Sequence, residues 1–285
     1  MSLPLETKSL PDYEQPPVVE TILGVQFERM PNWTNAHAGA FWKTLDGTEW
    51  PTTADAQPIQ PQYERFGDSA QWARGLKIQI SQSPAARLQI TNKAGNRMIQ
   101  LQNGRMHFNW LGSDGGGYPR YSAIRSEFGT MLSRFQEYCA REQVGDLRPN
   151  QWEVTYINLI PQGTVWNSAA DWGFFRPLGA MPTIDNLVAA ESFSGEWHFE
   201  IPKQQGRLHI DWRHIERTKP ESDDDLAAIQ LNLTARGPLE SAESTSATIL
   251  ERLDLGHDTI VSAFQELMSD SANRYWKLKN GHSNA

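Results

Sequence analysis

The chain has almost no cysteine and no long apolar stretch. Cys139 is the only cysteine among 285 residues, so the chain cannot form an internal disulfide. This composition is typical of a reducing compartment, and we expect a cytoplasmic location. No apolar run reaches the ~20 residues of a membrane-spanning helix. The first residues, MSLPLETKSLPDYEQPP, lack the basic and apolar regions of a secretory signal. We therefore expect no contact with a membrane.

Hydrophobic residues are also few. They make up 39% of the sequence, and the mean hydropathy is −0.57, whereas 11 Trp, 11 Phe and 7 Tyr are present. Because each aromatic side chain buries a large area, we expect a core that depends mainly on aromatic residues. The length is sufficient for one large domain or two closely packed ones.

Positive charge is scarce overall but concentrated in one part of the chain. The net charge is −8, yet residues 64–142 contain 11 Lys and Arg against 6 Asp and Glu. A local basic field can attract a polyanion, so this basic block makes a nucleic acid a candidate partner. The simpler interpretation is a solvated surface.

Signatures of catalysis and of metal binding are missing. The sequence has no GxSxG, no HExxH and no nucleotide-binding P-loop. His107, His198 and His209 have no neighbouring cysteine, and the acidic run at residues 221–225 lacks the spacing of a cation site. We read His257 as a helix-surface or packing residue rather than a base. We predict no catalytic residue, no metal and no cofactor.

A seven-residue sequence occurs twice. Gly104–Trp110 reads GRMHFNW and Gly206–Trp212 reads GRLHIDW, with four identical positions. This repeat predicts that one type of strand is used twice, in two related halves. Side chains alternate along a strand. We therefore expect Trp110 and Trp212 to be buried, and Arg105 and Arg207 to be exposed on the opposite face.

The order of expected elements agrees with two halves. We predict an extended arm over residues 1–17, which contributes little to stability up to Glu14. A first half then covers residues 18–145 and a second half residues 146–285, in one compact unit. The expected strands are Val18–Phe27, Leu76–Ser81, Arg87–Thr91, Arg97–Gln102, Arg105–Leu111, Trp152–Ile160, Leu187–Ile201, Gly206–Ile215 and Ala227–Ala235. The expected helical stretches are Asn35–Leu45, Tyr121–Glu142, Ala169–Phe175 and Thr245–Leu278, the last with a break or kink at Gly256. Residues 46–74 are expected to be irregular.

These elements predict an α+β fold. Each half is an antiparallel meander with a short helix and a long helix on one face, which is the order of TATA-binding-protein-like and helix-grip folds. If the helices cover the apolar face, the polar face remains for solvent or for a ligand. Glu20 and Glu153 lie in the first strand of each half, where they are either outward-facing or buried with a partner. The candidate ligand-binding residues are Lys77, Arg87, Arg105, His107, Asn109, Arg120, Arg207, His209 and Asp211.

Several phrases extend over nearly the whole chain in a recognisable order. They are PPVVETILGVQF, HFNW followed by YPRYSAIRSEF, PNQWEVTYINLI, and LDLGHDTIVSAFQELM followed by YWKL. Together they resemble a sporadically distributed prokaryotic protein family that has no assigned activity. The resemblance implies a cytoplasmic bacterial or archaeal protein, and the patchy distribution points to accessory systems such as phage defence. It transfers no functional residues.

Two hypotheses of function follow. The first is a non-enzymatic binding or interaction protein, with a protein partner or a second copy of the chain, or a nucleic acid on the basic block. The second is an enzyme or small-molecule binder that uses a cavity between the sheet and the long helix. An enclosed pocket with converging polar groups favours the second.

Overall fold

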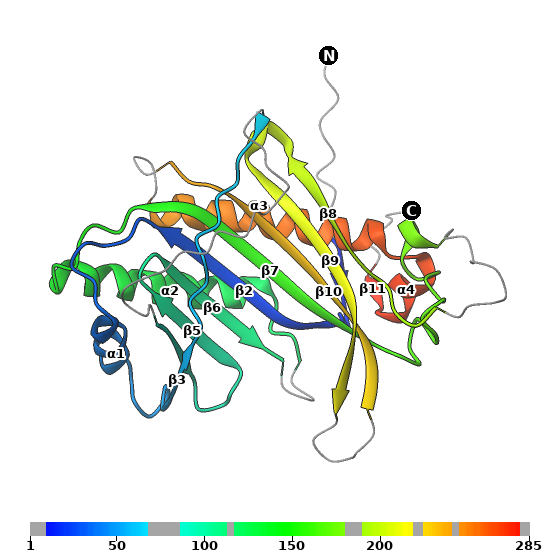
Figure 1. Ribbon diagram of the computed structural model, residues 1–285, viewed down its shortest axis with the longest axis horizontal. Coiled ribbons are helices and arrows are strands. Elements are labelled where there is room, and N and C mark those ends of the chain that lie inside the picture. Colours follow the sequence, from blue (N-terminus) through cyan, green and yellow to red (C-terminus); the bar gives the residue numbers. More distant parts are fainter. Residues whose placement is uncertain are drawn as a thin grey trace.

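The computed structural model describes residues 10–67, 86–112, 117–179, 190–218, 225–240 and 245–279. Its central feature is a sheet of nine strands, in the order β3-β4-β5-β6-β2-β7-β10-β9-β8, in which all neighbours are antiparallel (Figure 1). The fold is therefore α+β, with one large antiparallel sheet. The strands are β2 (Val18–Phe27), β3 (Thr52–Ala56), β4 (Arg87–Thr91), β5 (Arg97–Gln102), β6 (Arg105–Leu111), β7 (Pro149–Pro161), β8 (Ser194–Ile201), β9 (Gly206–Thr218) and β10 (Asp225–Pro238).

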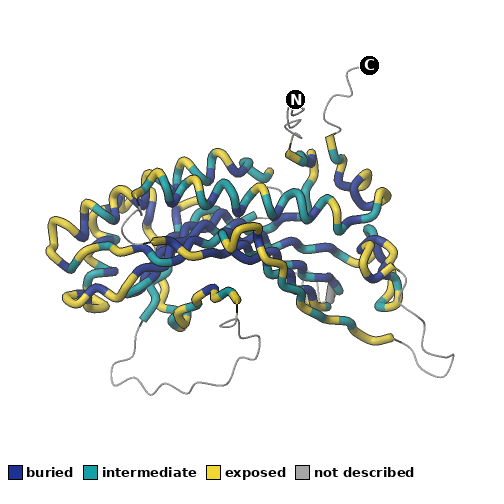
Figure 2. The backbone as a smooth tube through the Cα atoms, turned by 90° about the horizontal axis from the view of Figure 1, so that it is seen from above, coloured by how far each residue is buried: buried dark blue, intermediate teal, exposed yellow. Residues whose placement is uncertain are grey.

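The helices are α1 (Asn35–Lys43), α2 (Tyr121–Arg141), α3 (Ser246–Leu267) and α4 (Asp270–Tyr275), with 3-10 turns η2 at Arg176–Leu178 and η3 at Pro202–Gln204. The two long helices, α2 and α3, cover one face of the sheet. Figure 2 shows the long helices together on one side of the sheet. An irregular segment after β3 crosses the other side. None of the helices in the described residues is long and apolar enough to span a membrane.

The core lies between the sheet and the helices, and aromatic side chains fill much of it. On β6, Met106, Phe108 and Trp110 are buried toward the helices, as the strand alternation predicts. Phe135 of α2 packs edge-on against Phe41 of α1, at a ring-centroid distance of 5.4 Å. Trp110 and Trp212 are both buried, at 4% and 5% exposure, which confirms that part of the prediction.

Several predicted elements differ from the structure. The sequence between residues 46 and 74 was expected to be irregular but contains the edge strand β3. The strand expected from Leu187 begins at Ser194. A helical turn expected before Phe175 occurs instead as the 3-10 turn at Arg176–Leu178. The strand expected at Leu76–Ser81 lies outside the described residues.

Gly256 does not break the C-terminal helix. It lies in the middle of α3, where a Cβ atom would come within 2.7 Å of the Trp152 ring and 2.9 Å of Val154. The glycine is therefore a packing residue, because it lets α3 approach β7 closely. The helix ends at Leu267 instead.

The two copies of the repeated sequence do not occupy equivalent positions. The first copy is β6, which pairs directly with β2. The second is β9, which is separated from β7 by β10. The expectation that both strands pack equivalently is therefore wrong.

The described part of the N-terminal arm is docked on the fold. Asp12–Tyr13 forms β1, which pairs with β11 (Leu278–Lys279). Tyr13 is 6% exposed, and its hydroxyl donates a hydrogen bond of 2.6 Å to Asn273. A hydrophobic ring with a paired hydroxyl thus holds this part of the arm on the fold. That the arm contributes little to stability up to Glu14 stays a prediction.

Candidate functional site

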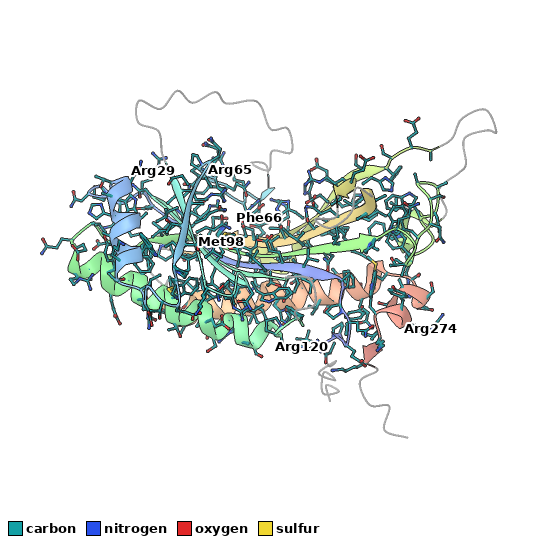
Figure 3. All side chains as sticks on the ribbon, turned by 90° about the horizontal axis from the view of Figure 1, so that it is seen from below. Arg29, Arg65, Phe66, Met98, Arg120 and Arg274 are labelled. Atoms are coloured by element: carbon teal, nitrogen blue, oxygen red, sulfur yellow. The ribbon has the colours of Figure 1, made fainter. Side chains whose placement is uncertain are left out.

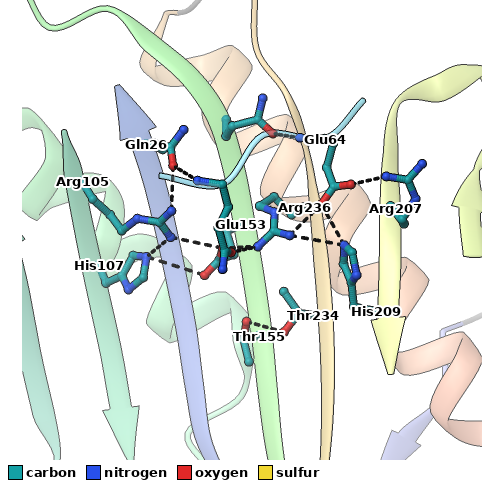
Figure 4. A network of polar contacts seen from close by, with 12 residues as sticks. Gln26, Glu64, Arg105, His107, Glu153, Thr155, Arg207, His209, Thr234 and Arg236 are labelled. Atoms are coloured by element: carbon teal, nitrogen blue, oxygen red, sulfur yellow. Dashed lines mark hydrogen bonds and ion pairs between the residues drawn. The ribbon is translucent and has the colours of Figure 1, made fainter. Parts of the chain in front are cut away.

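The polar face of the sheet is covered by a segment that we call the strap, residues 57–66. It crosses the strands on the side away from the helices, and Figure 3 shows its residues Arg65 and Phe66 on that side. Its backbone has no regular secondary structure. Beneath it lies a network of charged side chains, drawn in Figure 4.

Register places four residues of the network, and Gly24 between two of them, in one row across the sheet. His107 of β6 pairs with Gly24 of β2, and Gly24 pairs with Glu153 of β7. Glu153 pairs with Arg236 of β10, and Arg236 pairs with Arg207 of β9. Directly paired residues have neighbouring side chains on the same face. Strands that are distant in the sequence therefore assemble one continuous charged row.

Gly24 provides the space that this row needs. A Cβ atom at position 24 would lie 2.5 Å from Cδ2 of His107. The imidazole ring therefore lies over the backbone of β2 and reaches toward β7, where its Nε2 is 3.6 Å from Glu153 Oε1.

Glu153 is surrounded by positive charge. Arg105 Nη1 lies 3.3 Å from its Oε2, and Arg236 Nη1 lies 3.2 Å from the same atom. Burial alone would raise the pKa of Glu153, but His107 (charged at acidic pH), Arg105 and Arg236 outweigh burial and lower the pKa to about 2. Burial lowers the pKa of His107 itself to about 4, so the ring is neutral at pH 7.

Glu64 of the strap completes the network. Its Oε1 accepts hydrogen bonds from Arg236 Nε at 2.9 Å and Nη2 at 2.7 Å, and lies 2.8 Å from His209 Nε2. Arg207 Nη1 pairs with the other oxygen. Burial would raise the pKa of Glu64, but the His209 hydrogen bond and the Arg236 charge lower it to about 2. Glu64 is therefore ionised, and both of its carboxylate oxygens are paired.

The structure contradicts the prediction that Arg105 and Arg207 are exposed. They are 4% and 7% exposed, because the strap lies over them and Glu64 and Glu153 neutralise them. His107 and Asn109 are buried as well, and Asn109 bonds Glu20 at 2.5 Å. The idea that this face is open to solvent is therefore wrong for its central strands.

The other predicted site residues are more dispersed. His209 joins the Glu64 cluster. Arg87 bonds Gln100 at 2.6 Å, and Asp211 accepts from Asn232 at 2.8 Å. Arg120 lies on the helix side of the molecule (Figure 3), where it pairs with Asp12 at 2.6 Å. Lys77 lies outside the described residues.

A second candidate site is a cavity of about 560 Å³ on the helix side of the sheet. It lies between the N-terminal arm, the beginning of α2, the middle of α3 and strand β7. Most of its wall is apolar or aromatic. Its lining residues are Leu10, Pro11, Asp12, Tyr13, Pro16, Pro17, Val18, Tyr118, Arg120, Tyr121, Ser122, Arg125, Tyr156, Asn158, Asp254, His257, Asp258, Ile260, Val261 and Phe264.

Three polar rings meet at the inner wall of the cavity. The Tyr156 hydroxyl lies 2.8 Å from His257 Nδ1 and 2.9 Å from the Tyr118 hydroxyl. The Tyr121 ring stacks on the His257 imidazole, with centroids 3.9 Å apart and planes inclined by 3°. His257 is therefore a packing residue, as expected, but it also hydrogen-bonds within a cavity.

This group of rings is uncharged at neutral pH. Burial raises the pKa of Tyr118 and raises that of Tyr156 well above its usual value, so both hydroxyls keep their protons. Burial also lowers the pKa of His257 to about 4, so the imidazole is neutral. The polar groups can donate and accept hydrogen bonds, but they present no charge to a ligand.

Four of the five charged residues at the cavity form two ion pairs, and the fifth is Asp258. Arg125 makes two hydrogen bonds to Asp254, at 2.5 and 2.8 Å, and the Tyr121 hydroxyl donates to the same carboxylate at 2.8 Å. The side chains of Arg120 and Asp12 pair while they remain 42% and 46% exposed, so they lie at the solvent side. The polar rings inside the cavity are therefore neutral, whereas its charged lining residues comprise three aspartates and two arginines.

Sequence reasoning missed most of this second site. Tyr118, Tyr121 and Tyr156 come from a loop, a helix and a strand, and Tyr156 and His257 are 101 residues apart. One signal was available in the sequence: Tyr118, Tyr121, Tyr156 and His257 lie within the phrases on which the predicted family resemblance rests. No pattern of spacing joins them.

A metal or thiol site has little support. In the part of the chain that the structure describes, no three His, Cys, Asp or Glu residues are grouped to hold a metal ion. Cys139 is buried, and burial raises its pKa to about 12, which leaves an unreactive thiol.

Comparisons with known proteins give no match, either to a protein-family model or to a curated sequence. The resemblance to a prokaryotic family therefore stays a prediction.

Proposed function

We propose that this protein is a non-enzymatic binding protein and that its ligand is a small, uncharged molecule held in the cavity between β7 and α3. One observation carries the proposal. The cavity combines apolar walls with the neutral hydrogen-bonding rings of Tyr118, Tyr156 and His257. Its volume falls within the roughly 300–1,000 Å³ of typical small-molecule sites.

The chemistry of the lining favours an aromatic or cyclic ligand with one or two polar groups. An apolar wall stabilises a ligand by removing its surface from water. The Tyr118 and Tyr156 hydroxyls can accept or donate a hydrogen bond that fixes the ligand's orientation. An anionic ligand would lose its hydration without gaining a free counter-charge, because Arg125 is already committed to Asp254.

Binding is better supported than catalysis. A general base works best when its pKa lies near the working pH. His257 has a pKa of about 4, and the tyrosine pKa values are raised, so neither type of group exchanges protons readily at neutral pH.

A nucleic acid on the basic block has less support. That hypothesis needs Arg105 and His107 to face solvent, but both are buried and Arg105 is paired with Glu153. A protein partner in an accessory system, and a cytoplasmic location, stay predictions.

We also propose that residues 18–145 and 146–285 are halves related by duplication, in the order of a TATA-binding-protein-like fold. The support is connectivity. β2 pairs with β6, β7 pairs with β10, and β2 and β7 pair with each other at the junction. Each half closes with a long helix, α2 or α3.

Binding of the neutral dye Nile red, with a pair of variants at Val261, tests the proposed function. Val261 lines the cavity on α3. Val261→Trp fills the cavity and should abolish the dye's fluorescence increase, while Val261→Ala leaves space and should retain it. A folded Val261→Trp protein that binds Nile red as the wild type does would contradict the proposal.

A further inference from the structure

The strap is held as a bound peptide would be. Gln102 of β5 bonds Ile59 twice, because its Oε1 accepts from the Ile59 N–H and its Nε2 donates to the Ile59 carbonyl, both at 2.8 Å. Gln26 of β2 accepts from the Gln62 N–H at 2.8 Å. Gln151 of β7 accepts from the Glu64 N–H at 3.2 Å. Three strands therefore present amide side chains to the backbone of an extended segment.

The far end of the strap is fixed by arginine. Arg207 donates to the Arg65 carbonyl at 3.0 Å and lies 4.8 Å from the centre of the Phe66 ring. The Glu64 carboxylate fills the space between Arg207, Arg236 and His209. This site favours an anionic side chain. Without the Glu64 carboxylate, the buried guanidinium groups of Arg207 and Arg236 would each lose a counter-ion.

Little apolar burial holds the strap in place. Glu64 is the only residue of the strap that is buried, and Tyr63 is 54% exposed. Pro58 and Pro61 favour an extended conformation and prevent the strap from forming a helix or a strand of its own. A segment with few buried apolar contacts opens more readily than the core.

We propose that the strap is a displaceable occupant of a peptide-binding face, and that this face binds an extended, glutamate-containing segment of a partner protein. The strap shows what the face recognises: main-chain groups bound by Gln26, Gln102 and Gln151, and a carboxylate bound by Arg207 and Arg236. An incoming segment replaces each of these contacts, so Arg207 and Arg236 keep a counter-ion. This interaction surface lies on the opposite side of the sheet from the cavity and goes beyond the proposed function.

A fluorescein-labelled peptide with the strap sequence, QPIQPQYERF, is the probe. By fluorescence anisotropy, the peptide should bind full-length Glu64→Gln protein at least about tenfold more tightly than the wild type. The substitution weakens the contacts of the strap, so the peptide-binding face is uncovered in a larger fraction of the molecules. A peptide with glutamine in place of its glutamate should lose binding, and so should the Glu64→Gln, Arg207→Ala double variant. A folded Glu64→Gln protein that does not bind the peptide overturns the proposal.

Two further measurements cover the case in which Glu64→Gln does not fold. Gln102→Ala removes both bonds to Ile59 and leaves the Glu64 ion pairs, so it should also tighten peptide binding relative to the wild type. In the wild type, the amides of Gln62 and Glu64 should exchange with deuterium faster than those of Leu23 and Val25 in β2. Equal protection of strap and β2 amides overturns the proposal. A dimer of Glu64→Gln in light scattering also overturns it, since the occupant would then be the strap of a second copy.

Discussion

At the scale of single residues, Gly24 determines whether the charged row can form. The His107 ring occupies the place where a Cβ of residue 24 would be, and reaches across β2 to Glu153. A side chain at position 24 would push the imidazole away from Glu153 and strain a tightly packed sheet face.

We therefore predict that Gly24→Ala lowers the free energy of unfolding by about 1–3 kcal/mol. Gly39 in α1 provides a matched control, because nothing lies within 4 Å of an added Cβ there. Gly39→Ala should leave stability unchanged or raise it by up to about 1 kcal/mol. Chemical denaturation of both variants measures the difference, and equal stabilities would refute the role of Gly24.

The sequence could predict the polar side chains of the row, but not their burial. Alternation along a strand places Arg105 and His107 on one face, and that prediction is correct. Whether that face is exposed to solvent depends on the strap, which covers it. Glu64 lies in an irregular stretch that carries no periodic signal, so its contacts with Arg207 and Arg236 were not predictable.

At the scale of elements, strands and helices with a clear period were predicted well. The bounds of β2, β4, β5 and β6 agree with the prediction at both ends, and α2 differs from it by one residue. The edge strand β3, TTADA, was missed because it is short and only partly buried, which leaves no hydrophobic alternation to detect.

The order in which the strands pair in the sheet was less predictable than their positions in the sequence. Two copies of GRxHxxW suggested equivalent positions, yet β6 and β9 lie at different distances from the β2–β7 junction. Both β6 and β9 need an apolar face toward the helices and a basic face toward the strap, and the repeated sequence provides both. The repeat therefore reflects similar surroundings of the two strands and not equivalent positions in the sheet.

At the scale of the whole molecule, buried ionisable groups determine how the protein responds to acid. His107 and His257 have pKa values lowered to about 4 from 6.5, because burial disfavours the charged ring. As the pH falls, both histidines therefore take up a proton near pH 6.5 in the unfolded chain but only near pH 4 in the folded protein. Stability should fall as the pH decreases through this range.

The carboxylates extend this loss to lower pH. Glu64 and Glu153 have pKa values of about 2 in the folded protein against 4.5 in the unfolded chain, so their contribution is present above pH 4.5 and is lost toward pH 2. We predict that the free energy of unfolding in urea decreases in two overlapping stages below pH 6.5. Glu64→Gln should reduce the second stage. A stability that is constant between pH 7 and pH 4 would disagree with the buried neutral histidines.

The central claim is that the cavity beside α3 binds a small uncharged molecule. A crystallographic screen with neutral aromatic fragments tests it most directly. We predict that fragments occupy the cavity and place a polar atom within hydrogen-bonding distance of the Tyr118 or Tyr156 hydroxyl, with a ring against Val261 or Phe264. If fragments bind at other sites while no data set shows one in the cavity, the claim that the cavity binds a small uncharged molecule would be contradicted.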